Sequence, residues 1–260
     1  MTIPGMTRRR FLQQALLLTS LLVGGKPLRG AAQEERPPSS PFIFTQVRYR
    51  GGDWDPHPYA ARSILEEVER RTSIEVRKER QVITLLDPDL FSYPFLYLAG
   101  GEPFEPFTEE EVEVLRLFLT YGGFLLIEDT MGYKGLGFDR FIREQIRRIF
   151  PDRALERLPH DHTVYRSFYL IQSVGGRRIV NPYLEGVNVD NWTPLIYSQN
   201  DLAGAWERDF LGNWKYDVIP GGEAQRFQAF MLGVNLIMYA LTENYKQDRI
   251  HIPFINRKLG

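Results

Sequence analysis

The stretch Thr108–Gly132, TEEEVEVLRLFLTYGGFLLIEDTMG, decides the fold, because it contains the patterns of a helix, a glycine turn and a buried strand. Thr108 followed three residues later by Glu111 is a capping-box pattern, which predicts that a helix begins here. Apolar residues then recur at helical spacing, at Val112, Leu115, Phe118 and Leu119. Gly122 and Gly123 are typical of a helix end, so we expect the helix to stop there.

The second half of this stretch predicts a strand that carries two acids at its end. Residues 124–127 (FLLI) show no polar alternation, which is typical of a strand covered on both faces in a parallel sheet. Glu128 and Asp129 follow at the carboxyl end of that strand. Open α/β sheets bind their ligands at this edge. If the protein has a functional site, we therefore expect it beside these two acids.

Patterns elsewhere in the chain repeat this alternation of strand and helix. Strand patterns occur at residues 42–47, 93–99 and 194–198, and helical patterns follow Asp55 and recur at residues 138–150 and 223–242. Asp55 before Pro56 predicts the cap and first position of a helix. Strands that alternate with helices predict an α/β fold with a mainly parallel sheet and helices on both faces. Residues 42–260 are expected to form one such domain.

Composition limits the classes of function. The chain has 260 residues, 43% of them hydrophobic, and a formal net charge of −1, so its overall charge indicates no nucleic-acid partner. It contains no cysteine, which excludes disulfides, thiolate nucleophiles and cysteine-ligated metal sites.

The N-terminus has the pattern of an export signal. Residues 7–12 (TRRRFL) resemble the twin-arginine signal, and an apolar run over 15–23 is too short for a membrane span of about 20 residues. We expect residues 1–32 to be the signal, 33–41 a linker, and the mature protein to be periplasmic. Contact with the membrane is then expected only through an uncleaved signal.

Several segments together resemble a bacterial family, the domain of unknown function four-one-five-nine. They are residues 49–54 (YRGGDW), 121–125 (YGGFL), 158–162 (LPHDH), 196–202 (IYSQNDL), 233–235 (GVN) and 239–242 (YALT). The resemblance implies a flavodoxin-like fold of the class I glutamine amidotransferase type, and it implies no established reaction. Those amidotransferases use a cysteine, and this chain has none, so thiol-dependent glutaminase chemistry is excluded.

Three of the four histidines lie in expected loops among acids: His57, His160 and His162. With Asp129 they form the ligand set of a divalent metal site, which would activate water. The same groups, Asp129, His160 and His162, are alternatively candidates for metal-free acid–base catalysis. Surface hydrogen bonds and turn-capping explain these residue types equally well. The residues therefore predict no definite cofactor.

Residues that follow the expected strands are candidates for ligand binding. Arginines beside paired glycines present cations and free N–H groups to an anion, and acids at strand ends bind polar ligands. The candidates are Arg50, Gly51, Gly52, Asp53, Gly100, Gly101, Glu128 and Asp201.

Two hypotheses of function follow from these residues. The first is an exported, non-catalytic module that binds a small molecule or an envelope protein at the carboxyl edge of the sheet. The alternative is a hydrolase, metal-assisted or based on a His/Asp pair, that acts on an envelope carbohydrate or peptide. The sequence leaves open whether the chain is an enzyme.

Overall fold

A computed structural model of the chain describes residues 40–258, with side chains described through residue 242. The expected signal and most of the expected linker lie outside these residues. Within the described part of the chain, no helix is both long and apolar enough to span a membrane.

The centre of the domain is one seven-stranded sheet in the order β2-β1-β3-β4-β7-β6-β5. Neighbouring strands from β2 to β7 pair in parallel, whereas β6 and β5 are antiparallel to their neighbours at one edge. The strands are β1 (Phe42–Val47), β2 (Val76–Ile83), β3 (Phe95–Gly100), β4 (Phe124–Asp129), β5 (Glu156–Arg157), β6 (Glu185–Val189) and β7 (Trp192–Ser198). The predicted α/β class with a mainly parallel sheet is confirmed.

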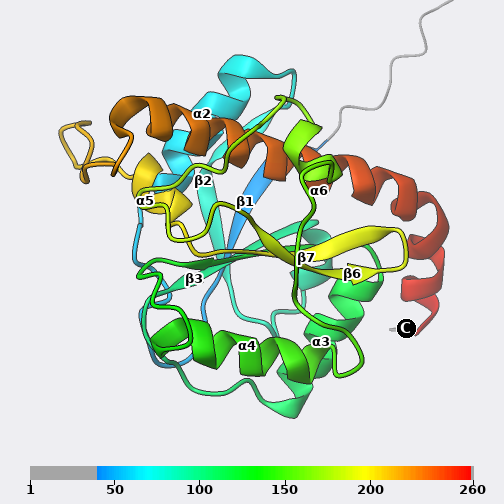
Figure 1. The fold of residues 1–260 in the computed structure, drawn as a ribbon. Helices are drawn as coiled ribbons and strands as arrows, with labels where there is room; N and C mark the ends of the chain where they lie inside the picture. Colours follow the sequence, from blue (N-terminus) through cyan, green and yellow to red (C-terminus); the bar gives the residue numbers. More distant parts are fainter. Residues whose placement is uncertain (1–39, 259–260) are drawn as a thin grey trace, which may run out of the picture. The chain divides into compact units, whose positions relative to one another are not determined.

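Helices cover both faces of this sheet (Figure 1). On one face lie α2 (Ala60–Arg71), α5 (Leu202–Trp206) and α6 (Gly222–Lys258), which contact one another. On the other face lie α3 (Glu109–Thr120) and α4 (Gly137–Ile149). Short 3-10 turns occur at η1 (Leu90–Ser92) and η2 (Thr163–Arg166). The core between the layers is rich in buried aromatic rings, and Phe95 packs on both Phe42 and Phe124.

The stretch from Thr108 forms the predicted helix, turn and strand. The Glu111 N–H donates to Thr108 Oγ1 over 3.2 Å, and the Thr108 N–H donates to Glu111 Oε2 over 2.7 Å, which completes the capping box. After the turn, β4 pairs with β3 on one side and β7 on the other, and all six of its residues are buried. This local pattern therefore determines the middle of the sheet.

The predicted start of α2 is wrong. The helix begins at Ala60 rather than beside Asp55, and Asp55 instead accepts hydrogen bonds from the Arg80 guanidinium over 2.5 and 2.6 Å. The first N–H groups are capped by a distant carboxylate, because the Tyr59 N–H donates to Glu207 Oε2 over 3.1 Å. A cap supplied from so far along the chain leaves no local pattern.

Replacing Thr108 with alanine should lower the free energy of unfolding by about 1 kcal/mol, because it removes the side-chain acceptor of the capping box. Urea denaturation measures this change. Thr120→Ala is the matched control, since Thr120 is exposed at the last position of the same helix and should change stability by less than about 0.5 kcal/mol. Equal losses in the two variants would contradict the capping role.

Candidate functional site

Glu128 lies at the carboxyl end of β4 and is completely buried. Its carboxylate accepts hydrogen bonds from the N–H groups of Leu202 and Ala203, the latter over 3.2 Å. The Tyr97 hydroxyl, from the neighbouring strand β3, donates to Glu128 Oε2 over 2.6 Å. Glu128 thus joins β3 and β4 to the start of α5, and both of its oxygens are occupied by internal donors.

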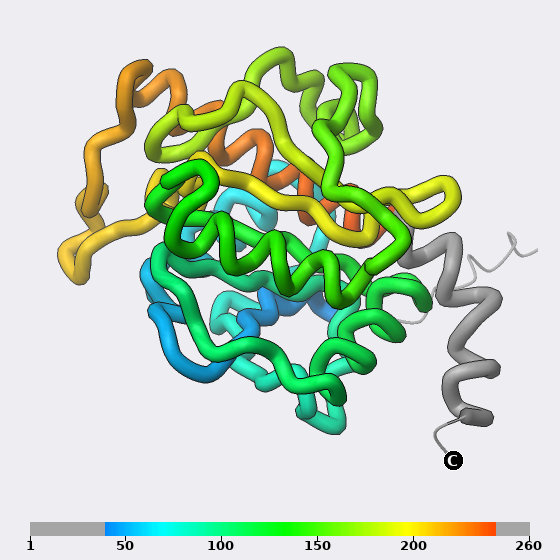
Figure 2. Tube along the Cα trace, turned by 60° about the horizontal axis from the view of Figure 1, so that its bottom comes forward, coloured from blue at the N-terminus to red at the C-terminus, as the bar shows by residue number. Residues whose placement is uncertain are grey.

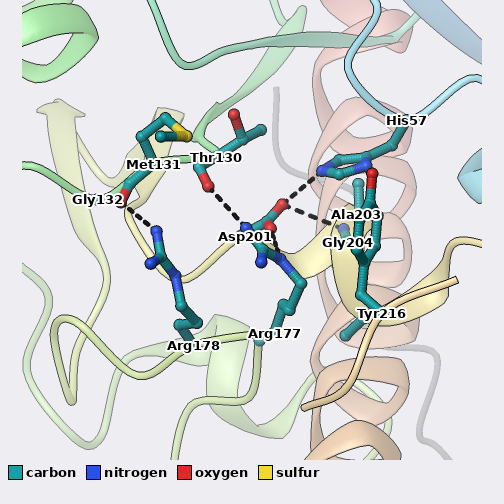
Figure 3. Close-up of polar contacts among 12 residues, drawn as sticks. His57, Thr130, Met131, Gly132, Arg177, Arg178, Asp201, Ala203, Gly204 and Tyr216 are labelled. Carbon is teal, nitrogen blue, oxygen red and sulfur yellow. Dashed lines mark hydrogen bonds and ion pairs between the residues drawn. The ribbon is translucent and has the colours of Figure 1, made fainter. Parts of the chain in front are cut away.

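Asp201 is the second buried acid and the centre of the cluster in Figure 3. It caps α5 by accepting the Gly204 N–H over 3.1 Å, from a left-handed backbone conformation. His57 Nε2 lies 2.7 Å from Asp201 Oδ1, and the Arg177 guanidinium pairs with Asp201 Oδ2. Tyr216 contacts the His57 ring and lies under the Arg177 guanidinium. The expected separate loops at residues 57 and 201 therefore meet here.

The buried charges shift one another's pKa values. Burial, together with the charge of Asp201, raises the pKa of Glu128 to about 7. Burial alone would lower the pKa of His57, but its hydrogen bond to Asp201 and the nearby carboxylate charges raise it above its usual value. Burial would raise the pKa of Asp201, yet His57 and Arg177 hold it below its usual value. Near neutral pH the cluster therefore favours a charged His57–Asp201 pair.

The loops after β1 and β3 meet at the point where the strand order changes direction. Asp53 Oδ1 accepts the Gly101 N–H over 2.9 Å and the Glu102 N–H over 3.3 Å. Those donors would otherwise face an anionic ligand. Gly100 lies at the end of β3, where an added Cβ would lie only 2.8 Å from the Phe138 ring. The structure thus brings the candidates Asp53 and Gly101 into contact, and the carboxylate itself occupies the N–H groups.

Arg50 and the two glycines after it have structural contacts. Arg50 pairs with Glu111 over 2.9 Å and with Glu105 over 3.1 Å, so two carboxylates already bind its guanidinium. Gly51 and Gly52 have φ values of 69° and 59°, a backbone conformation that glycine adopts at little cost. This segment forms a tight turn held against the start of α3.

Asp129 closes the turn after β4. Its Oδ1 accepts the N–H groups of Met131 and Gly132, each over 2.8 Å. Burial raises the pKa of this carboxyl above its usual value. The carbonyl oxygens of Thr130 and Met131 in turn accept hydrogen bonds from Arg177 and Arg178, as Figure 3 shows.

The structure does not bring the three candidate histidines together. His162 lies beside Thr193 at the start of β7, with 3.0 Å between His162 Nε2 and Thr193 Oγ1, whereas His57 lies at the opposite, carboxyl edge. His160 is exposed and lies near Arg157. The expected meeting of His57, His160 and His162 beside Asp129 is therefore wrong, because His162 packs at the start of β7 while His57 contacts Asp201 beyond its carboxyl end. Among the described side chains, no group of three or more His, Asp or Glu residues could hold a metal ion.

The His57–Asp201 pair resembles a base with an orienting acid. Asp201 binds Nε2, and His57 Nδ1 is buried without a hydrogen-bond partner in the part of the chain that the structure describes. A nucleophile activated by this imidazole would have to donate to that nitrogen. Among the described residues, the contacts of the cluster join the segments at His57, Arg177 and Asp201.

The outer surface of the sheet's carboxyl edge has more exposed apolar side chains than the sequence patterns predict. Large apolar side chains are exposed on its loops, and we call seven of them the carboxyl-edge apolar surface: Met131, Tyr133, Leu136, Ile179, Phe210, Leu211 and Ile219. Arg178 connects three of these loops, because it donates to the Met131 carbonyl over 2.5 Å and forms a bridge with Ile219. Periodicity could not find these residues, because they lie outside helices and strands.

Phe210 and Leu211 are the most prominent members of this surface, with 89% and 72% exposure. They lie at the tip of a hairpin, residues 207–216, which projects from the domain in Figures 1 and 2. Asp209 builds the tip by accepting the N–H groups of Leu211 and Asn213 over 2.9 and 2.8 Å. An ordered turn therefore holds two apolar side chains in solvent.

Comparison with known proteins places the sequence in a family context. A family model described as Domain of unknown function (DUF4159) matches residues 43–241, nearly all of the described domain. A search of the curated proteins found no match.

Stability should fall as the pH rises from about 5 to about 8. A group whose pKa is higher in the folded state stabilises the fold below its unfolded pKa and loses that contribution as pH rises through the folded value. Glu128 loses its stabilising contribution between pH 4.5, its usual pKa, and about pH 7, its pKa in the folded state. His57 adds a further loss of stability above pH 6.5, its usual pKa. Asp201, whose pKa is lowered in the folded state, adds stability as the pH rises, but this gain is complete below about pH 5. Urea denaturation across the range measures the decline.

His57→Gln should reduce this decline, since glutamine can still donate to Asp201 but does not titrate. His160→Gln is the matched control and should keep the wild-type profile, because His160 is exposed and lies outside the cluster. Stability that is independent of pH in the wild type, or an equal reduction in both variants, would contradict the role of His57.

Proposed function

We propose a binding function from the premise that this chain belongs to the DUF4159 family, whose description names no reaction. The protein is a non-catalytic module of the cell envelope, and it binds a partner protein at the carboxyl edge of its sheet. The observation that carries this proposal is the contrast between the two layers of that edge. Acids and His57 are buried in internal contacts, while large apolar side chains are exposed on ordered loops.

The arrangement of the sheet supports the choice of this edge. The five parallel strands, taken in chain order, follow the spatial order 2-1-3-4-5, which is the flavodoxin-like order. We therefore relate the fold to the flavodoxin-like group that includes the class I glutamine amidotransferases. In such sheets the carboxyl edge at the switch point is the binding edge. Here Asp53 occupies the switch-point N–H groups, so the exposed loops are the better surface for a partner.

The chemistry of the loops favours a protein with an apolar surface and acidic groups around it. Exposed apolar patches that polar residues surround are typical of protein–protein interaction sites. Cations adjoin the apolar residues here, since Lys134 lies between Tyr133 and Leu136, and Arg178 precedes Ile179. Phe42, where the domain begins, lies at the opposite edge.

A photo-reactive amino acid at Leu211 should form adducts with one defined envelope protein in the native cell, because Leu211 is the exposed tip of the proposed surface. Denaturing electrophoresis and mass spectrometry measure the adducts. Leu170 is the matched control, since it is equally exposed at 77% but lies in the segment held by Asn235 of α6. Adducts from Leu170 alone, or none from Leu211 and Tyr133, would count against the proposal.

We also propose that the twin-arginine pathway exports the protein. Arg8→Lys/Arg9→Lys should leave the precursor in the cytoplasm, because the receptor of that pathway reads the arginine pair. Cell fractionation measures the distribution. Arg10→Lys is the control, since Arg10 stands at the variable position of the signal and its replacement should leave export unchanged. Continued export of the double variant would contradict this route.

A further inference from the structure

A pocket of about 400 Å³ lies apart from the buried carboxyl-edge cluster. It is formed by the outer side of α2, the first turns of α6 and the stem of the 207–216 hairpin. Figure 1 shows these helices side by side on one face of the sheet. Its volume lies within the range of small-molecule sites, roughly 300–1,000 Å³.

Aromatic side chains provide the apolar part of this pocket. Trp214 and Phe230 lie 5.8 Å apart between ring centroids, and Phe230 also packs on the buried Trp206, which fixes its position. Phe227, one turn before Phe230 on α6, is 49% exposed and lines the same pocket. An aromatic or acyl group that contacted Phe227 and Trp214 would remove this surface from water.

The charges of the pocket are predominantly positive. Arg70 and Arg71 share a single carboxylate, that of Glu67, so one of their two charges is not compensated. Arg226 pairs with Glu223 over 2.9 Å.

The other acid of the lining, Glu66, pairs with Arg62 outside the pocket. Arg208 forms no ion pair with any carboxylate in the described part of the chain. An anion entering the pocket therefore meets uncompensated guanidinium charges.

Arg208 is held in a position to bind such an anion. Its guanidinium stacks over the Trp214 ring at 3.5 Å, and the Nη1 group donates to the Gly212 carbonyl over 2.6 Å. Arg226 lies over the same ring at 4.4 Å. An arginine fixed in this way loses little side-chain entropy on binding, and its remaining N–H groups match the oxygens of a carboxylate or sulfonate.

We propose that this pocket is a binding site for a small amphipathic anion. The apolar body of the ligand contacts Phe227 and Trp214, and its anionic group pairs with Arg208. The site is separate from the proposed partner surface, although both use the same hairpin: the stem lines the pocket and the tip carries Phe210 and Leu211.

Two related dyes test the proposal with the folded domain. The anionic probe is 8-anilinonaphthalene-1-sulfonate, and N-phenyl-1-naphthylamine is the same aromatic body without the sulfonate. The sulfonate dye should bind more tightly by about five-fold, which corresponds to one partly exposed ion pair. Arg208→Gln should abolish this preference and Arg208→Lys should retain most of it. Fluorescence titration measures both affinities.

Further variants separate the pocket from other apolar surfaces. Phe227→Ser should weaken both dyes by roughly ten-fold and should fold normally, because the ring is half exposed. Leu211→Ser and Arg140→Gln should change neither affinity, since the first alters only the hairpin tip and the second removes an exposed charge on α4. Equal affinities of the wild type for the two dyes, or weakening by Leu211→Ser rather than by Phe227→Ser, would overturn the proposal.

Discussion

The carboxyl edge of this sheet depends on one buried acid, Glu128, whose pKa of about 7 leaves it partly ionised near neutral pH. Removing an isolated ion from water costs several kcal/mol unless donors replace its hydration. Here the donors are the Tyr97 hydroxyl and the first N–H groups of α5. The carboxylate therefore fixes α5 at the end of β4. Because Asp201 is the N-cap of α5, the position of His57 and Arg177 follows from the same contact.

The acidic cluster therefore has a structural role in this domain. Acids at the end of a central parallel strand are commonly catalytic, but in this domain they connect loops that are far apart in sequence. Glu128, Asp201 and Glu207 each accept backbone N–H groups at a helix start, and Asp129 and Asp53 do the same in turns. The exposed loops of the same edge carry large apolar side chains, such as Phe210 and Leu211, beside polar and charged residues of both signs. Our proposal of binding by the loops rests on this division between buried acids and exposed apolar side chains.

The parts of the fold that sequence could predict are those determined by neighbours along the chain. The helix at Thr108 and strand β4 obey local rules of capping and hydrophobic periodicity, and both were predicted correctly. The cap of α2 was not, because Glu207 lies far along the chain from the Tyr59 N–H that it binds. The candidate site divides in the same way: Glu128 and Asp201 could be placed at strand ends, whereas the contact between His57 and Asp201 depends on tertiary packing. The separation of His162 from His57 likewise depends on tertiary packing, because His162 contacts Thr193 at the start of β7 and His57 contacts Asp201 beyond its end.

In the hairpin at residues 207–216, the residue that forms the turn is separate from the residues exposed at the tip. Asp209 forms the turn with its own side chain and backbone, so the two tip residues that follow make no contact required by the fold. Substitutions at such exposed positions usually alter stability by less than about 0.5 kcal/mol. Phe210 and Leu211 can therefore be replaced while the scaffold is retained, so the composition of this surface is independent of the stability of the domain.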